Sequence, residues 1–189
     1  MGGTFDPIHL GHLRAVENAR EALGLDRVDF ITSRNPPHRE AAASSPLDRF
    51  AMVVLATAGN TAFVASEIEL HREGPSYTVE TVAELRRDHP ADDFVLIMGS
   101  DAFRELQSWK EAERLLGLCM VAVVDRPESA PTAVSTPRVD EGAGIARVEG
   151  PGLDVSATVI RERVGQGRSI RYLVPDAVAD YVEKRGLYR

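Results

Sequence analysis

Two histidines near the start of the chain, His9 and His12, are the first residues whose type and spacing could do chemistry. They lie in GGTFDPIHLGH (residues 2–12), where two glycines and an Asp-Pro turn precede a helical pattern. Residues three apart on a helix share a face, so both imidazoles project from one side of the first turn. The N–H groups and dipole at a helix start favour anions, and glycine lets the backbone approach a ligand closely. The segment therefore predicts a phosphate site, although HxGH alone also fits an ordinary turn with two surface histidines.

Other chemistries are less well supported in this segment. The sequence has no GxxxxGK(S/T) segment, and no GxGxxG segment follows a strand pattern. A zinc site is disfavoured because the two histidines have neither cysteine partners nor an HExxH helix. We therefore expect no dedicated metal ligands in the protein.

The elements that must position these residues alternate between helical and strand patterns. The strands largely lack polar alternation and are joined through helices, which is typical of a parallel sheet covered on both faces. The sequence therefore predicts a doubly wound, Rossmann-like α/β fold with helices on both faces. The expected strands cover residues 28–32, 62–66, 67–71, 94–98 and 119–124, the expected helices cover about 8–23, 50–58, 78–89, 156–164 and the stretch after Pro175, and residues 126–152 are expected to form a loop.

Composition and length set limits on the class of protein. A chain of 189 residues suits one domain, residues 1–189. The net charge of −7, with no basic cluster, argues against nucleic-acid binding and against membrane-surface binding as the main role. The longest apolar stretch, LLGLCMVAVV, is far shorter than a membrane span of about 20 residues. With no signal-peptide pattern and a lone Cys119, we expect a cytoplasmic protein.

The start of the chain is unusual for this fold class. In doubly wound folds a glycine turn before a helix normally follows the carboxyl end of a strand. Only Met1 precedes Gly2 here. We therefore expect the native start to lie upstream, so that the first strand is truncated in this chain.

Segments beyond the first loop indicate what kind of phosphate ligand the protein binds. GGTFDPIHLGH closely resembles the (H/T)xGH signature of the nucleotidylyltransferase superfamily, and VSATVIRERVGQGRSIRYLVPDAVADYV is similar to its ISSTxIR segment and following tail. Together with NPPHR, SYT at 76–78, and GSD ahead of SWK, these segments resemble one family in the expected order over nearly the whole chain. That family is the bacterial nicotinate-nucleotide adenylyltransferases.

This resemblance implies a reaction and an ATP site. Members transfer the adenylyl group of ATP to nicotinate mononucleotide, giving deamido-NAD and pyrophosphate. The attacking phosphate oxygen is already ionised at neutral pH, so catalysis is expected to rest on positioning and charge stabilisation rather than on a general base. His12, and then His9, are the expected catalytic residues. The other ATP contacts implied by the resemblance are Gly3, Thr4, Phe5, Gly99, Asp101, Ser156, Thr158 and Arg161.

Some of these residues also fit plainer roles. Without the resemblance, Ser156 and Asp101 would be interpreted as helix caps. Ala157 stands where the family commonly has a second serine, so one hydroxyl contact is absent. Magnesium is expected as a cofactor held mainly by ATP oxygens and water.

The resemblance also implies a site for the second substrate. Thr78, at a helix start, is expected to offer N–H groups to the pyridine carboxylate. Trp109 could stack on the pyridine ring, although a lone tryptophan equally fits a core position. Arg39 stands where lysine is frequent in the family, and Lys110 where some relatives have an aromatic residue. The full expected set is Asn35, His38, Arg39, Arg49, Tyr77, Thr78, Trp109 and Lys110.

Alternatives remain open at the level of sequence. The acceptor could be nicotinamide mononucleotide or phosphopantetheine, and the chain could be a non-catalytic nucleotide-sensing module that uses the same pocket. The oligomeric state is also open, and a homo-oligomer is one option. Pyrophosphate release separates the enzyme from the sensor.

Overall fold

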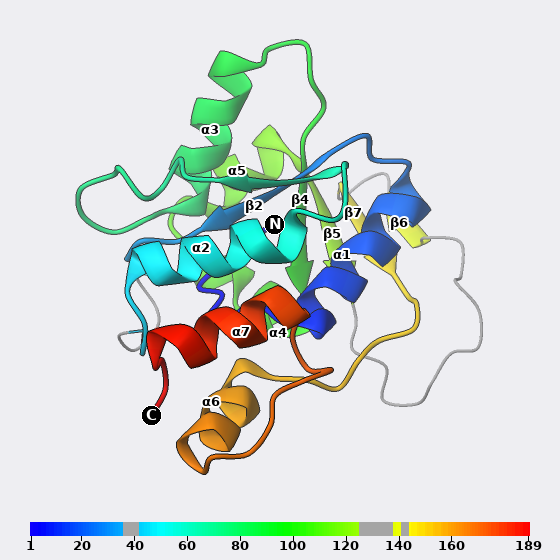
Figure 1. The fold of residues 1–189 in the computed structure, drawn as a ribbon. Helices are drawn as coiled ribbons and strands as arrows, with labels where there is room; N and C mark the ends of the chain where they lie inside the picture. Colours follow the sequence, from blue (N-terminus) through cyan, green and yellow to red (C-terminus); the bar gives the residue numbers. More distant parts are fainter. Residues whose placement is uncertain (36–41, 125–137, 141–143) are drawn as a thin grey trace.

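A computed structural model describes residues 1–35, 42–124, 138–140 and 144–189 (Figure 1). Its strands form two hydrogen-bonded groups, in the orders β1-β2-β3 and β4-β5-β7-β6. β1 of the first group lies beside β4 of the second. The bounds are β1 Gly2–Gly3, β2 Val28–Thr32, β3 Phe63–Ser66, β4 Val95–Gly99, β5 Met120–Val124, β6 Arg138–Asp140 and β7 Ile145–Val148.

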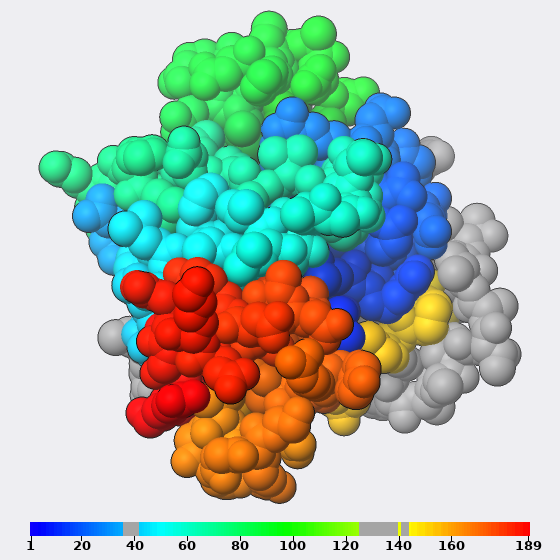
Figure 2. Space-filling view, viewed as in Figure 1, coloured from blue at the N-terminus to red at the C-terminus, as the bar shows by residue number. Residues whose placement is uncertain are grey.

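Helices cover both faces of these strands. Alternate residues of β4 point to opposite sides: Ile97 packs in one apolar cluster, whereas Leu96 and Met98 pack in another. The first cluster is completed by α1, α2, α6 and α7, and the second by α3, η1 and α5. Figure 2 shows α2 in cyan and α7 in red side by side on the first face. The bounds are α1 Leu10–Leu23, α2 Pro46–Thr57, α3 Thr78–Asp88, α4 Ser100–Arg104, η1 Leu106–Ser108, α5 Ala112–Leu118, α6 Ala157–Gly165 and α7 Asp176–Arg185.

The doubly wound α/β fold expected from the sequence is confirmed. The strand predicted at residues 28–32 has the predicted bounds, and Gly24 ends α1 in the left-handed conformation with φ 62°. The first strand consists of Gly2 and Gly3, which pair in parallel with β2. Whether the native start lies upstream stays a prediction.

The expectation of a loop throughout residues 126–152 was wrong for the described part of that segment. Residues 145–148 form β7, parallel to β5, and β6 pairs with β7 in the antiparallel direction. β7 places Ala146 and Val148 in the core on either side of Arg147, a period-two pattern only four residues long. Such a short signal between glycines is hard to recognise before the neighbouring strand is known.

The strand expected at residues 67–71 was also wrong. This segment turns back on itself, and the N–H of Leu70 donates to the carbonyl of Glu67 at 2.8 Å. Burial does not follow the alternation of polar and apolar residues in EIEL, because Glu69 is buried together with Leu70. Glu69 accepts a hydrogen bond from Thr81 of α3 at 2.7 Å, so a glutamate that the pattern placed in solvent is a paired group inside a turn.

The strand order places the segments that follow β1 and β4 next to each other. β1 and β4 are adjacent, and both run toward the same edge of the sheet before the chain enters α1 and α4. Such switch points between strands are where open α/β sheets bind ligands, at the carboxyl ends of the strands. In Figure 1, the arrowhead of β4 points to the end of the molecule where α4 and α6 lie.

Candidate active site

His9 and His12 stack on each other at the start of α1. Their ring centroids lie 3.6 Å apart with 23° between the ring planes. His9 is the N-cap of α1, and the Nδ1 atom of each ring accepts the backbone N–H of the other residue at 3.3 Å. Because both Nδ1 atoms accept, each neutral ring carries its proton on Nε2, which is the donor that each ring can offer. The prediction that both imidazoles share one side of the helix start is confirmed.

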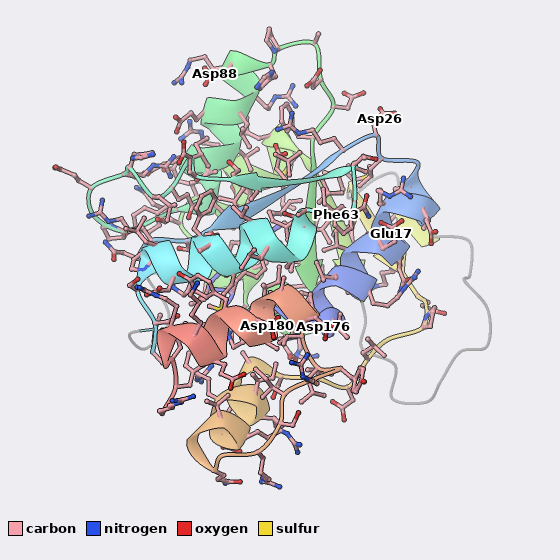
Figure 3. All side chains as sticks on the ribbon, in the orientation of Figure 1. Glu17, Asp26, Phe63, Asp88, Asp176 and Asp180 are labelled. Carbon is pink, nitrogen blue, oxygen red and sulfur yellow. The ribbon has the colours of Figure 1, made fainter. Side chains whose placement is uncertain are left out.

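The backbone donors at this helix start are used largely within the protein. The N–H of Leu10 donates to the carbonyl of Leu173 at 2.9 Å, in the segment that leads into α7. That segment contains Arg171, which pairs with Asp176 and Asp180 of α7 at 3.4 and 3.3 Å. Figure 3 labels these two aspartates. The N–H of His12, the third residue of α1, donates to the Nδ1 atom of His9. A phosphate contact at this helix start stays a prediction, with the imidazoles as its expected donors.

Phe5 supports the histidine pair from the core side. Its ring meets the His12 ring edge-on, with centroids 5.4 Å apart, and its side chain is 3% exposed. Phe5 has φ 49°, a left-handed conformation that costs a non-glycine residue roughly 1–3 kcal/mol. A Cβ added to Gly3 would lie 3.0 Å from two carbons of this ring. Any larger residue at position 3 would therefore have to displace the Phe5 ring by a few tenths of an ångström.

Asp6 connects the first loop to two distant segments. Its buried carboxylate accepts hydrogen bonds from the N–H of Ala43 at 2.6 Å, from the hydroxyl of Ser44, and from the hydroxyl of Tyr188 at 2.8 Å. Burial raises the pKa of Tyr188 well above its usual range, so the phenol keeps its proton and donates. Asp6 thus holds the first loop, the chain ahead of α2 and the chain beyond α7 at one point.

The start of α6 lies on the same side of the sheet as the start of α1. Nη1 of Arg161 donates to the carbonyl of Asp6 at 2.9 Å, and the carbonyl of Leu153 lies 3.2 Å from a Cβ built on Gly11. Ser156 caps α6, with its Oγ accepting the N–H of the third residue at 3.3 Å. The two helix starts named by the sequence, at residues 9–12 and 156–161, therefore adjoin one another. The contacts of Ser156, and of Thr158 beside Arg161, with ATP stay predictions.

Asp101 lies at the carboxyl end of β4. It occupies the first turn of α4, where its exposed carboxylate pairs with Arg104. Gly99 is the N-cap of that helix, and the described residues make no side-chain cap there, so Asp101 is not the cap. An exposed carboxylate at the switch point suits the expected contact with ribose hydroxyls, which stays a prediction.

The second-substrate residues fall partly in one group. Nδ2 of Asn35 donates to the carbonyl of Gly74 at 3.2 Å, and the carbonyl of Asn35 accepts the N–H of Ser76 at 3.1 Å. These bonds bring the end of the β2 loop against the segment that starts α3 at Thr78, with Tyr77 as its N-cap. His38 and Arg39 lie outside the described residues.

Lys110 and Trp109 lie on the chain that faces the start of α3. Nζ of Lys110 sits 4.1 Å from the centroid of the Tyr77 ring and pairs with Glu80 at 2.6 Å. The hydrogen bond that Lys110 donates to Glu80 raises the pKa of Lys110 above its usual value. Trp109 is half-buried and packs against the apolar cluster of α3 and α5, so the structure gives it a packing role beside any stacking on substrate.

Arg49 is placed differently from the expectation. Its side chain is buried, with the whole residue 1% exposed. Nη1 donates to the carbonyls of Thr4 and Ser33 at 2.7 Å each, and Nη2 donates to the carbonyl of Arg34 at 3.2 Å. Burial lowers the pKa of Arg49 from its usual value. These three bonds hold the ends of β1 and β2 together, which is the role that the structure shows for Arg49, and its contact with substrate stays a prediction.

Comparison with known proteins decides the family. A protein of Thermus thermophilus called "Probable nicotinate-nucleotide adenylyltransferase" is 45% identical over 193 residues, and the match covers 100% of this chain and 97% of the relative. A protein of the same name from Trichlorobacter lovleyi is 42% identical over 207 residues, with 100% and 97% covered. The chain belongs to the nicotinate-nucleotide adenylyltransferase family.

Broader comparisons agree with this family. The model of the cytidylyltransferase-like family matches residues 1–163. Two solved structures of the Plasmodium falciparum nicotinic acid mononucleotide adenylyltransferase, one complexed with APC and one with NaAD, share the fold with a TM-score of 0.76 at 18% identity. Each match covers 99% of this chain and 94% of the other. At this identity the nicotinate-nucleotide adenylyltransferase fold is what the structures support.

Three residues of this adenylyltransferase site were missed by sequence reasoning: Asp6, Ser44 and Tyr188. Asp6 was interpreted as part of a turn with Pro7, and its position inside the glycine-rich segment was the one available signal. Ser44 lies in a stretch of small residues, and Tyr188 is separated from Asp6 by 182 positions. The bonds of Ser44 and Tyr188 join them to a segment far away in the chain, so no local pattern indicated these two residues.

Two findings on this adenylyltransferase concern membranes and metals. Within residues 1–35, 42–124, 138–140 and 144–189, no helix has the length and apolar character to span a bilayer. Over the same ranges, no three His, Cys, Asp or Glu side chains gather into a group that could hold a metal ion.

Proposed function

We propose that this protein transfers the adenylyl group of ATP to nicotinate mononucleotide, giving deamido-NAD and pyrophosphate. The observation that carries the proposal is the contact between Arg161 and the Asp6 carbonyl, which brings the α6 start to the stacked histidines. The relatives at 42–45% identity carry the same activity in their names. This combination favours catalysis over a non-catalytic sensor, which does not need aimed donors.

The chemistry follows from what these side chains can do. A phosphate oxygen of the mononucleotide forms a bond to the α-phosphorus of ATP, and the bond from that phosphorus to the bridging oxygen of the β-phosphate breaks. Pyrophosphate leaves with that oxygen and its charge. The Nε2–H donors of His12 and His9 and the Arg161 guanidinium stabilise charge on the phosphates, with His12 half-buried and His9 almost enclosed.

Magnesium enters this scheme with the nucleotide. The acidic groups beside the proposed site are engaged: Asp6 accepts three donors, and Asp101 pairs with Arg104. Oxygens of ATP and water are therefore proposed as its ligands, and the ion supplies charge neutralisation on the phosphates. EDTA is expected to abolish turnover and added Mg²⁺ to restore it, whereas tight binding of Mg²⁺ to the protein without ATP would contradict this assignment.

The acceptor half of the site is proposed around the start of α3. That start has no side-chain cap among the described residues, so the N–H groups from Thr78 onward suit a carboxylate. Tyr77, Asn35, Lys110 and Trp109 surround it, and His38 and Arg39 are proposed from the sequence alone. An uncapped helix start favours the nicotinate acid over the nicotinamide amide, because only the acid carries the negative charge.

One assay tests the function and the choice of acceptor together. The protein is incubated with ATP and Mg²⁺, with nicotinate mononucleotide or nicotinamide mononucleotide as acceptor, and pyrophosphate release is measured. We expect release with the acid and a clearly higher kcat/KM for it than for the amide. Binding of ATP without release of pyrophosphate would support the sensor, and a preference for the amide would overturn the acid assignment.

A cytoplasmic location stays a prediction from the sequence.

A further inference from the structure

Tyr188 reaches the proposed ATP site from beyond α7, which ends at Arg185. Its hydroxyl donates to Oδ1 of Asp6 at 2.8 Å and lies 3.2 Å from the hydroxyl of Ser44. Its backbone carbonyl lies 3.5 Å from a Cβ built on Gly165, the last residue of α6. The residue therefore packs between the end of α6 and the loop that carries the histidines.

Asp6 connects Tyr188 to Arg161 through two different groups. The carboxylate accepts Tyr188, and the backbone carbonyl of the same residue accepts Nη1 of Arg161 at 2.9 Å. A carboxylate held by three donors fixes the orientation of the peptide that carries it, because each bond constrains it from a different direction. The position of that carbonyl in turn sets where the guanidinium lies relative to the histidine pair.

The backbone is strained on both sides of this contact. Phe5, directly before Asp6, has φ 49°, and Tyr188 has φ 65°. Both are left-handed conformations, which are unfavourable for residues with a Cβ and persist only where the surroundings impose them. Around Tyr188, the hydroxyl bonds to Asp6 and Ser44 and the packing against the first apolar cluster accompany this conformation, which places the hydroxyl at the carboxylate.

We propose that Tyr188 is a positioning residue for adenylyl transfer, which holds Asp6 and thereby sets Arg161 against the phosphates of ATP. The inference rests on the proposed function, since it gives Arg161 a triphosphate to meet. Tyr188 itself touches neither substrate in this scheme. Its effect on Arg161 is transmitted through the carboxylate and the backbone carbonyl of Asp6.

The test compares Tyr188→Phe with a matched control, Tyr181→Phe. Tyr181 of α7 donates to Oδ1 of Asp48 in α2, also at 2.8 Å, so the control removes the same kind of tyrosine–aspartate bond outside the proposed site. Both variants are expected to lower Tm by similar amounts. Because a small misplacement of a positioned group can cost up to about a hundredfold in rate, Tyr188→Phe is expected to lower kcat about tenfold, with Tyr181→Phe within about twofold of the wild type.

A second readout compares the affinities for the two substrates. A variant that had only lost stability would not change the affinity for ATP while keeping that for nicotinate mononucleotide. In Tyr188→Phe the dissociation constant for ATP, measured by calorimetry, is expected to rise about fivefold, with KM for nicotinate mononucleotide within about twofold. In an Arg161→Lys background, Tyr188→Phe is expected to have little further effect on kcat, because the residue it positions is already changed. A full tenfold loss in both backgrounds would overturn the proposal.

Two other outcomes would also overturn it. One is a kcat and an ATP affinity for Tyr188→Phe equal to those of the wild type, with Tm lowered as in Tyr181→Phe. If Tyr188→Phe does not fold, Ser44→Ala removes another donor to the same carboxylate, and an unchanged kcat there is the contrary result. Absence of pyrophosphate release by the wild type would count against the proposed function, and the ATP affinities of wild type and Tyr188→Phe would still decide the positioning role.

Discussion

Arg161 donates a hydrogen bond to the backbone carbonyl of Asp6 at 2.9 Å, across 155 positions of sequence. This bond joins the start of α6 to the loop that carries His9 and His12. The sequence predicts that both helix starts bind the phosphates of one ATP molecule, which requires them to lie close together. Their contact means that one ligand can meet both.

His12 is expected to be the more important of the two histidines in turnover. His12→Ala removes its Nε2–H donor, and the loss of one aimed donor typically lowers kcat by about a hundredfold or more. His71→Ala is a suitable control because its imidazole is exposed and pairs with Glu67 of the same turn. Steady-state kinetics measures both. Near-normal turnover in His12→Ala would remove this residue from the mechanism.

Arg49 is expected to affect folding more than substrate affinity. Arg49→Met removes three hydrogen bonds, to the carbonyls of Thr4, Ser33 and Arg34, from a side chain that is itself buried, which is expected to destabilise the protein by about 3 kcal/mol or more. The control is Arg86→Met, which removes an arginine–carbonyl hydrogen bond at an exposed position, the bond to Leu118. Urea unfolding of this control is expected to differ from the wild type by less than about 1 kcal/mol. Equal stabilities of the two variants would contradict the role given to Arg49.

The two glycines at the start of the chain are expected to respond differently to alanine. Gly3→Ala places a Cβ 3.0 Å from the Phe5 ring, and the ring can relieve this only by moving against His12. We expect lower Tm and lower kcat. For Gly2→Ala no described atom lies within 4 Å of the new Cβ, so both quantities are expected to stay close to those of the wild type. Thermal unfolding and kinetics on both variants test this contrast.

Asp48 is expected to make stability depend on pH in the acid range. Hydrogen bonds from Ser45, first, and then Tyr181, together with the charge of Arg185, lower its pKa in the folded protein. Its contribution is therefore complete above about pH 4, the usual range of an aspartate, and is lost as the pH falls through the lowered folded pKa. The wild type should exceed Asp48→Asn in free energy of unfolding at pH 7, and the gap should narrow at low pH. A gap that stays constant with pH would show that Asp48 does not titrate in this way.

The sequence was most informative where a signal is local. The strand at residues 28–32, the left-handed Gly24 after α1 and the Ser156 cap of α6 each depend on residues within one turn or one strand. The same holds for the histidine pair, since a spacing of three on a helix brings the two rings together. Where a local pattern was ambiguous, as at residues 67–71, the prediction was wrong.

The sequence by itself therefore determined the doubly wound class, the family and the positions of most of the helices, and it supplied the candidate site residues as predictions. Only the tertiary structure decided that Arg49 is buried among three carbonyls, that β7 joins β5, and that Asp6 is the common partner of Ser44, Arg161 and Tyr188. The physical reason is the range of the interactions. A helix cap or a strand pattern is set by neighbours in sequence, whereas a buried guanidinium or carboxylate takes whatever partners the packed chain brings to it.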